Sequence, residues 1–110
     1  MVVGTGLIDL RIPESGSLKE KRGVLSRIIR RTRNKFNVSI AEVGDNDHWR
    51  RARIGFSVVG NDKPYINAKM DHILNFIDQL LLADVVRSRI EIASFSDLAD
   101  GGDIEEGKYE

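Results

Sequence analysis

The order of two hydrophobic periodicities along the chain constrains its fold more than any other feature. Apolar and polar residues alternate near residues 2–13, 36–41, 51–58 and 85–95, which is the pattern of half-buried strands. Apolar residues recur at helical spacing between the first two of these segments and again between the last two. This order predicts an α+β fold, a ferredoxin-like βαββαβ sandwich with a four-stranded antiparallel sheet and two helices on one face.

Both predicted helices have a start signal and an apolar stripe. Ser17 and Glu20 have the spacing of a capping box, and Pro64 follows a turn that leads into the second helix. The lysines of the first helix, Lys21 included, are expected on its solvent side. The stripe of the first helix consists of Leu18, Leu25, Ile28, Ile29 and Thr32, and that of the second consists of Ile66, Met70, Ile73, Leu74, Ile77 and Leu81.

The chain is neutral overall, but its charge is unevenly distributed. Residues 97–110 contain six carboxylates and one lysine, hence −5, and residues 1–96 contain 16 basic and 11 acidic residues, hence +5. A length of 110 residues is typical of one domain. We therefore predict a ferredoxin-like domain over residues 1–96 and an acidic, disordered tail over residues 97–110. The tail either solubilises the protein or lies over its basic surface.

Basic residues are concentrated on the first predicted helix. Eight of them, against Glu20 alone, fall within residues 18–35, whereas a merely solvated helix mixes both signs. Such clusters are typical of proteins that bind nucleic-acid phosphates, although a solubilising face is the simpler alternative. The predicted nucleic-acid-binding residues are Arg22, Arg27, Arg30, Arg31, Arg33 and Lys35 on this helix, and Arg50, Arg51 and Arg53 on the following hairpin.

The open face of the predicted sheet is half apolar and half charged. Strand parity directs Phe56 beneath the helices and leaves Phe95 as the one aromatic residue on that face, so we expect RNA contacts mainly to the backbone. The apolar part of this face favours a partner, such as a second copy in a homodimer. The alternative function is therefore a homo-oligomeric protein-interaction module that uses the open sheet face and binds no nucleic acid. The predicted interface residues are Leu7, Val43, Val59, Ala93 and Phe95.

Metal and thiol chemistry are not expected. The chain has no cysteine, which excludes disulfides, thiolate metal sites and thiol nucleophiles. Asp45, Asp47 and His48 are close in sequence, but this is ordinary turn composition without a second ligand pair, so no metal site is predicted. Trp49 is expected to anchor the turn on the domain. No cofactor is predicted.

Catalysis is also not expected, because the chain has no phosphate loop, nucleophile elbow or convincing pair of histidine and carboxylate. Arg11 and Asn61 would supply the residue pair of acylphosphatases, which share this fold and size. Residues 14–17 stand, however, where those enzymes have a glycine-rich phosphate cradle. With no long apolar segment and no signal-peptide pattern, we predict a cytoplasmic location, no membrane contact and no known small-molecule ligand.

Several blocks of the sequence resemble the YlxP-like family of bacterial proteins. In chain order they are Ser17 to Arg22, Arg33 to Ser39, Ala41 to Val43, Asp47 to Ala52 and Val59 to Asp62. The function of this family is unknown, so the resemblance assigns no residue a role. It implies a ferredoxin-like domain and, in many bacteria, a gene beside those for initiation factor two and ribosome-binding factor A. That neighbourhood favours an RNA- or ribosome-associated role, with ribosomal or other structured RNA as the expected partner.

Overall fold

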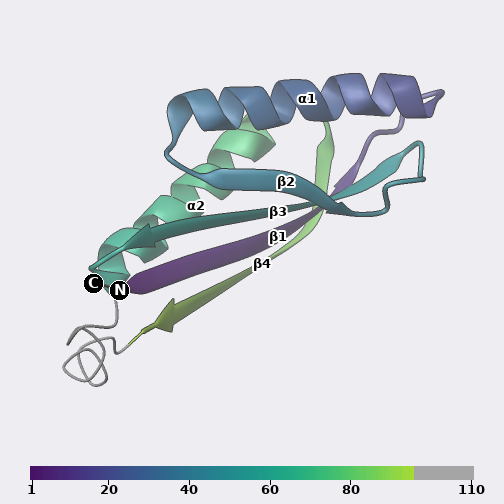
Figure 1. The fold of residues 1–110 in the computed structure, drawn as a ribbon. Coiled ribbons are helices and arrows are strands. Elements are labelled where there is room, and N and C mark those ends of the chain that lie inside the picture. Colours follow the sequence, from purple (N-terminus) through teal and green to yellow (C-terminus); the bar gives the residue numbers. More distant parts are fainter. Residues whose placement is uncertain (96–110) are drawn as a thin grey trace, which may run out of the picture.

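The computed structural model describes residues 1–95, and its element order is the predicted one (Figure 1). The strands form one antiparallel sheet in the order β2-β3-β1-β4, and both helices lie on the same side of it, which confirms the fold prediction. The acidic segment 97–110 lies outside the described residues. The elements are β1 (Val2–Arg11), α1 (Leu18–Lys35), β2 (Ser39–Gly44), β3 (Arg51–Gly60), α2 (Lys63–Gln79) and β4 (Asp84–Ser94).

The hydrophobic core lies between the sheet and the helices. Alternate residues of the two central strands, such as Ile8 and Ile54, are completely buried there. Gly6 also faces the core, where a Cβ atom would overlap the ring of Phe56, so this glycine lets the ring lie across β1. The helices contribute Leu25, Ile28, Ile66, Met70, Ile73 and Ile77.

Both helices begin where the sequence predicts. Ser17 Oγ accepts a hydrogen bond from the backbone N–H of Glu20 at 3.1 Å, and Glu20 Oε1 accepts one from Gly16 N at 2.7 Å. The side chain of Asp62 caps α2 by accepting from Tyr65 N at 3.0 Å. Neither helix is long and apolar enough to cross a membrane, a finding that covers residues 1–95.

Leu81 does not belong to the apolar stripe of α2, so this prediction is wrong. The helix ends at Gln79, and Leu81 adopts a positive φ of 56° with 84% of its surface exposed. Helical spacing cannot extend past the last helical residue, because the left-handed backbone redirects the side chain.

Lys21 is buried, so the expectation that it faces solvent is wrong. Its side chain is completely buried beneath the first turns of α1. Its Nζ donates hydrogen bonds to the carbonyl oxygens of Asp45, Asn46 and Arg51, at 2.6, 3.3 and 3.0 Å. Glu42 Oε2 lies 3.0 Å from Nζ, and this buried oxygen has no other polar partner within residues 1–95. One ammonium therefore joins α1 to β2, to β3 and to the loop between them.

An ion cluster crosses three strands on the open face of the sheet. Asp9 Oδ1 lies 2.7 Å from Arg53 Nε, and Asp9 Oδ2 lies 3.3 Å from Arg87 Nη2. Asp9 is the register partner of Arg53 on β3 and of Arg87 on β4. The hydrogen bond from Arg53, helped by Arg87, lowers the pKa of the Asp9 carboxyl below its ordinary value of 3.8, against the opposing effect of partial burial.

We expect the substitution Lys21→Met to destabilise the fold strongly. It leaves three carbonyl groups and the partly buried Glu42 carboxylate without their cation. Removing one partner of a buried ion pair costs about 3–5 kcal/mol. The loss of stability is the difference in the free energy of unfolding between the wild type and the variant, measured by urea titration. Lys19→Met on the exposed side of the same helix is the control and should change stability by less than about 0.5 kcal/mol. Equal effects of the two substitutions would contradict the structural role of Lys21.

We expect the Asp9 cluster to make stability depend on acid pH. Because the pKa of Asp9 is lowered on folding, its contribution is complete above the unfolded pKa and is lost as the pH falls through the folded pKa. Urea midpoints measured from about pH 6 to about pH 2 should therefore fall less steeply for Asp9→Asn than for the wild type. Asp71→Asn, at an exposed site on α2, should leave the profile unchanged. Parallel profiles of Asp9→Asn and wild type would rule out this contribution.

Candidate nucleic-acid interface

The outer face of α1 carries a set of exposed cations. The helix buries Lys21, Leu25, Ile28 and Thr32 and turns its remaining basic residues away from the core. Within residues 1–95, no ion pair neutralises the five predicted binding residues that are exposed and lie on this face. We call these residues the α1 basic face; they are Arg22, Arg27, Arg30, Arg31 and Lys35.

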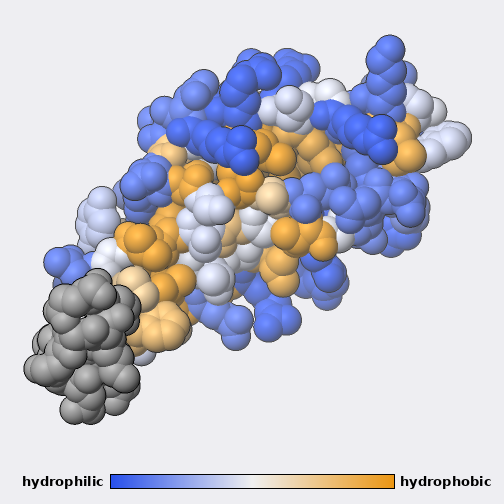
Figure 2. Space-filling view, in the orientation of Figure 1, coloured by the Kyte–Doolittle hydropathy of each residue, from blue (hydrophilic) through white to orange (hydrophobic). Residues whose placement is uncertain are grey.

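The spacing of these residues brings their charges together. Arg30 and Arg31 follow Arg27 by three and four positions, and Lys35 follows Arg31 by four. Residues at this spacing have neighbouring side chains on the helix surface. The one acidic residue of the helix, Glu20, is held by its bond to Gly16 N. Figure 2 shows hydrophilic side chains along the edge of the molecule that α1 forms. The α1 basic face therefore presents several guanidinium groups with free donors.

Arg33 has a structural contact at the margin of this face. Its Nη2 donates to the carbonyl oxygen of Ile40 at 3.1 Å. Ile40 belongs to β2, which is an edge strand, so the guanidinium covers part of a free edge. A hollow of about 520 Å³ between α1 and β2 is bordered by Arg33 and Arg30.

The arginines predicted on the hairpin do not join the α1 basic face. Arg50 Nε donates to the carbonyl oxygen of Ser15 at 3.0 Å, which ties the loop to the segment before α1. Arg51 and Arg53 lie on the open face of the sheet, on the side away from the helices. Arg53 is paired there with Asp9. The structure thus brings together five of the nine predicted residues and places the others elsewhere.

The open face is ordered in rows across the strands, and all five predicted interface residues point to it or to its end. At one end Val3 is the register partner of both Val59 and Ala93, which forms an apolar row next to Phe95. The sequence analysis missed Val3, which the same strand parity could have found. At the other end the rows are charged, first Asp9 with Arg53 and Arg87, then Arg11 with Arg51 and Asp84.

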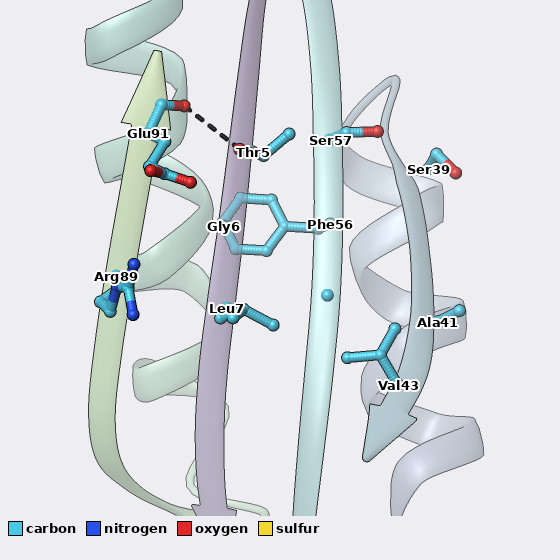
Figure 3. A pocket seen from close by; sticks show the side chains of 11 residues that line it. Thr5, Gly6, Leu7, Ser39, Ala41, Val43, Phe56, Ser57, Arg89 and Glu91 are labelled. Atoms are coloured by element: carbon cyan, nitrogen blue, oxygen red, sulfur yellow. Dashed lines mark hydrogen bonds between the residues drawn. The ribbon is translucent and has the colours of Figure 1, made fainter.

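Between these ends the open face is hollowed. Figure 3 shows Leu7 and Val43 extending toward the middle of the sheet, with Thr5 and Ser57 above them. The hollow has a volume of about 430 Å³ and is apolar at Leu7, Ala41 and Val43 and polar at Arg89 and Glu91. Leu7 is 38% exposed and Val43 53%, so this part of the face is open to a partner.

The loop between β2 and β3 differs from its prediction at Trp49. The side chain is 52% exposed, so it does not anchor the loop by burial. Asp45 adopts a positive φ of 57°, and its carbonyl accepts from His48 N at 3.0 Å, which are features of a turn. Within residues 1–95 no group of three or more acidic or histidine side chains is arranged to hold a metal ion.

Arg11 and Asn61 are far apart. Arg11 is the register partner of Arg51 at one end of the β1–β3 ladder, whereas Asn61 follows Gly60 at the other end. Nine residue steps of strand separate the two ends, or roughly 30 Å. They therefore do not form the arginine and asparagine pair of an acylphosphatase-like site.

Comparison with known proteins gives a family. Residues 3–90 match the sequence model of the family described as "Protein of unknown function (DUF503)". The "Uncharacterized protein YlxP" of Bacillus subtilis (strain 168) is 42% identical over 77 residues, which is 70% of this chain and 84% of that protein.

Solved structures resemble the chain more distantly. The de novo designed protein Foldit4 has a TM-score of 0.49 at 14% identity, covering 86% of this chain and 99% of the design. A REP-associated tyrosine transposase bound to a REP hairpin has a TM-score of 0.45 at 11% identity, covering 91% of this chain and 61% of that protein. The family match and the identity to the Bacillus protein confirm the resemblance found in the sequence: the chain belongs to the DUF503 family, whose function is unknown.

Proposed function

We propose that the protein is an RNA- or ribosome-associated accessory factor that binds RNA phosphates through the α1 basic face. The observation that carries this proposal is the set of five exposed basic residues that have no acidic partner within residues 1–95. Lys and Arg gathered on one element form the electrostatic footprint of nucleic-acid binding.

The arrangement of these charges is unfavourable for the isolated protein. Like charges four positions apart, as in Arg27 with Arg31 and Arg31 with Lys35, destabilise a helix by about 0.2–0.5 kcal/mol per pair. A polyanion bound across them offsets this repulsion and releases counterions, which supplies most of the affinity of non-specific nucleic-acid binding. Arginine suits such contacts because its planar guanidinium can form two parallel bonds with one phosphate.

Contacts of this type predict little sequence specificity. Phosphate contacts position a protein on nucleic acid but do not read its bases. The α1 basic face alone accommodates the backbone of RNA or DNA. The gene neighbourhood implied by the resemblance to the YlxP-like family, among translation genes, is what favours RNA.

A second candidate is a homodimer formed through the open face. Its support is the apolar row of Val3, Val59 and Ala93, in which Val59 is 65% exposed, together with Phe95, which is 55% exposed. The sheet has three strands of 10, 10 and 11 residues and one of 6 residues. With strands about 4.8 Å apart it outlines roughly 600 Å², compared with the roughly 800 Å² that each partner buries in a standard interface. A dimer through this face would leave the α1 basic face accessible, because the two lie on opposite sides of the sheet.

We expect the double variant Arg30→Glu/Arg31→Glu to bind RNA at least about 10-fold more weakly at low salt. The slope of log affinity against log salt concentration should correspond to about one to two fewer neutralised phosphates. Binding is measured by co-sedimentation with ribosomal subunits and by anisotropy of labelled RNA over a salt series. The matched control, Lys63→Glu/Arg89→Glu, changes the net charge equally at exposed sites on α2 and β4. Equal losses in both variants, or wild-type binding that is insensitive to salt, would contradict the proposal.

For the second candidate, we expect the wild type to sediment as a dimer and Val59→Asp/Phe95→Asp as a monomer, because a buried carboxylate without a partner opposes association. Sedimentation velocity gives the mass of each. Leu81→Asp alters an exposed apolar residue outside the sheet and should remain dimeric. A monomeric wild type at high protein concentration would eliminate this candidate.

A further inference from the structure

Trp49 is the one tryptophan of the chain, and it lies on the surface of the β2–β3 loop. It borders a hollow of about 420 Å³ together with Asp47, His48 and Arg50. With 52% of its surface exposed, the indole keeps a large part of its ring in solvent. An aromatic ring left this open contributes little to the core but offers a flat surface to a ligand.

The backbone on both sides of Trp49 is held in place. Lys21 Nζ binds the carbonyl oxygens of Asp45 and Asn46 before it and of Arg51 after it. The carbonyl oxygen of Arg50 accepts from Ile12 N at 2.8 Å. The indole is therefore presented on a fixed support, which lowers the entropic cost of binding a flat ligand.

Charged and imidazole side chains line the hollow beside the indole. Arg51 Nη2 lies 2.8 Å from His48 Nε2, within hydrogen-bond distance. Arg50 lines the hollow, and Arg51 lies opposite Arg11 in the strand register at the end of the sheet. The hollow is lined by one carboxylate, Asp47, and one guanidinium, Arg50, and Arg51 adds a second guanidinium next to it through its contact with His48.

The loop also adjoins the start of the α1 basic face. Lys21, which binds the loop carbonyls, is followed directly by the exposed Arg22. In Figure 1 the β2–β3 loop lies below the N-terminal end of α1. An RNA strand on the α1 basic face therefore has a route to Trp49 at this end of the molecule.

We infer that Trp49 is a stacking site for an unpaired nucleobase of the RNA whose phosphates contact the α1 basic face. This inference rests on the proposed function and adds a preference for single-stranded RNA, since a base inside a duplex has no free face to offer. Stacking of one base on an aromatic side chain is tolerant of sequence, because every base has a π face. It also departs from the expectation that RNA contacts go mainly to the backbone.

The single tryptophan makes this inference directly measurable. A 12-nucleotide oligoadenylate and a 12-base-pair RNA duplex are titrated at low salt, reading anisotropy of the labelled RNA for binding and tryptophan emission for stacking. The single strand should quench Trp49 and the duplex should not. Trp49→Ala should weaken single-strand binding by roughly 5- to 150-fold and leave duplex binding unchanged, whereas Trp49→Phe should retain most of the affinity.

The outcomes separate this inference from the proposed function. In one outcome, RNA binding depends on salt and is weakened by Arg30→Glu/Arg31→Glu but not by Trp49→Ala, and RNA leaves the tryptophan emission of the wild type unchanged. This result overturns the stacking site and leaves the proposed function intact. Quenching by inorganic polyphosphate equal to that by RNA also overturns it, because polyphosphate has no base. No binding of either RNA at low salt overturns both. A thermal melt of Trp49→Ala monitored by circular dichroism verifies that the variant is folded.

Discussion

The Lys21 ammonium holds α1, both strands of the β2–β3 hairpin and their loop at one point. Its acceptors are three backbone carbonyls and the Glu42 carboxylate, which come from segments 21 to 30 residues further along the chain. Burying this charge is tolerable because every proton of the ammonium has an acceptor. The position of α1 over the edge of the sheet, and hence the direction of its basic side chains, depends on this contact, as does the shape of the loop that carries Trp49.

The two surfaces of interest have opposite electrostatic character. On the α1 basic face, like charges accumulate without acidic partners among residues 1–95, whereas on the open face Arg53 and Arg87 share the Asp9 carboxylate. Paired charges on an exposed sheet keep it soluble and define the register of neighbouring strands. Arg33 has an intermediate role, because its guanidinium covers a carbonyl of the edge strand β2. Charge count alone therefore does not separate candidate binding residues from structural ones.

The fold was predictable from the sequence because each element has a clear periodicity and the core residues follow it, as Ile8, Ile54 and Ile73 do. The burial of Lys21 was not, because it depends on carbonyl groups that only the folded hairpin gathers. The pairing of Asp9 with Arg53 and Arg87 required the strand register, which periodicity does not specify. The exposure of Trp49 depends on the loop conformation, and Arg51 and Arg53 separate from the α1 basic face because β3 alternates.

The Lys21 contact also makes the loop and the first turns of α1 one cooperative unit. Local opening of the helix start removes the cation from beneath the loop, so the three carbonyls lose their donor at the same moment. Amide groups of these distant segments should thus exchange with solvent through a common opening event. Any partner that binds across both segments stabilises the unit as a whole and slows that exchange by mass action. A surface assembled in this way is present only when the helix has docked.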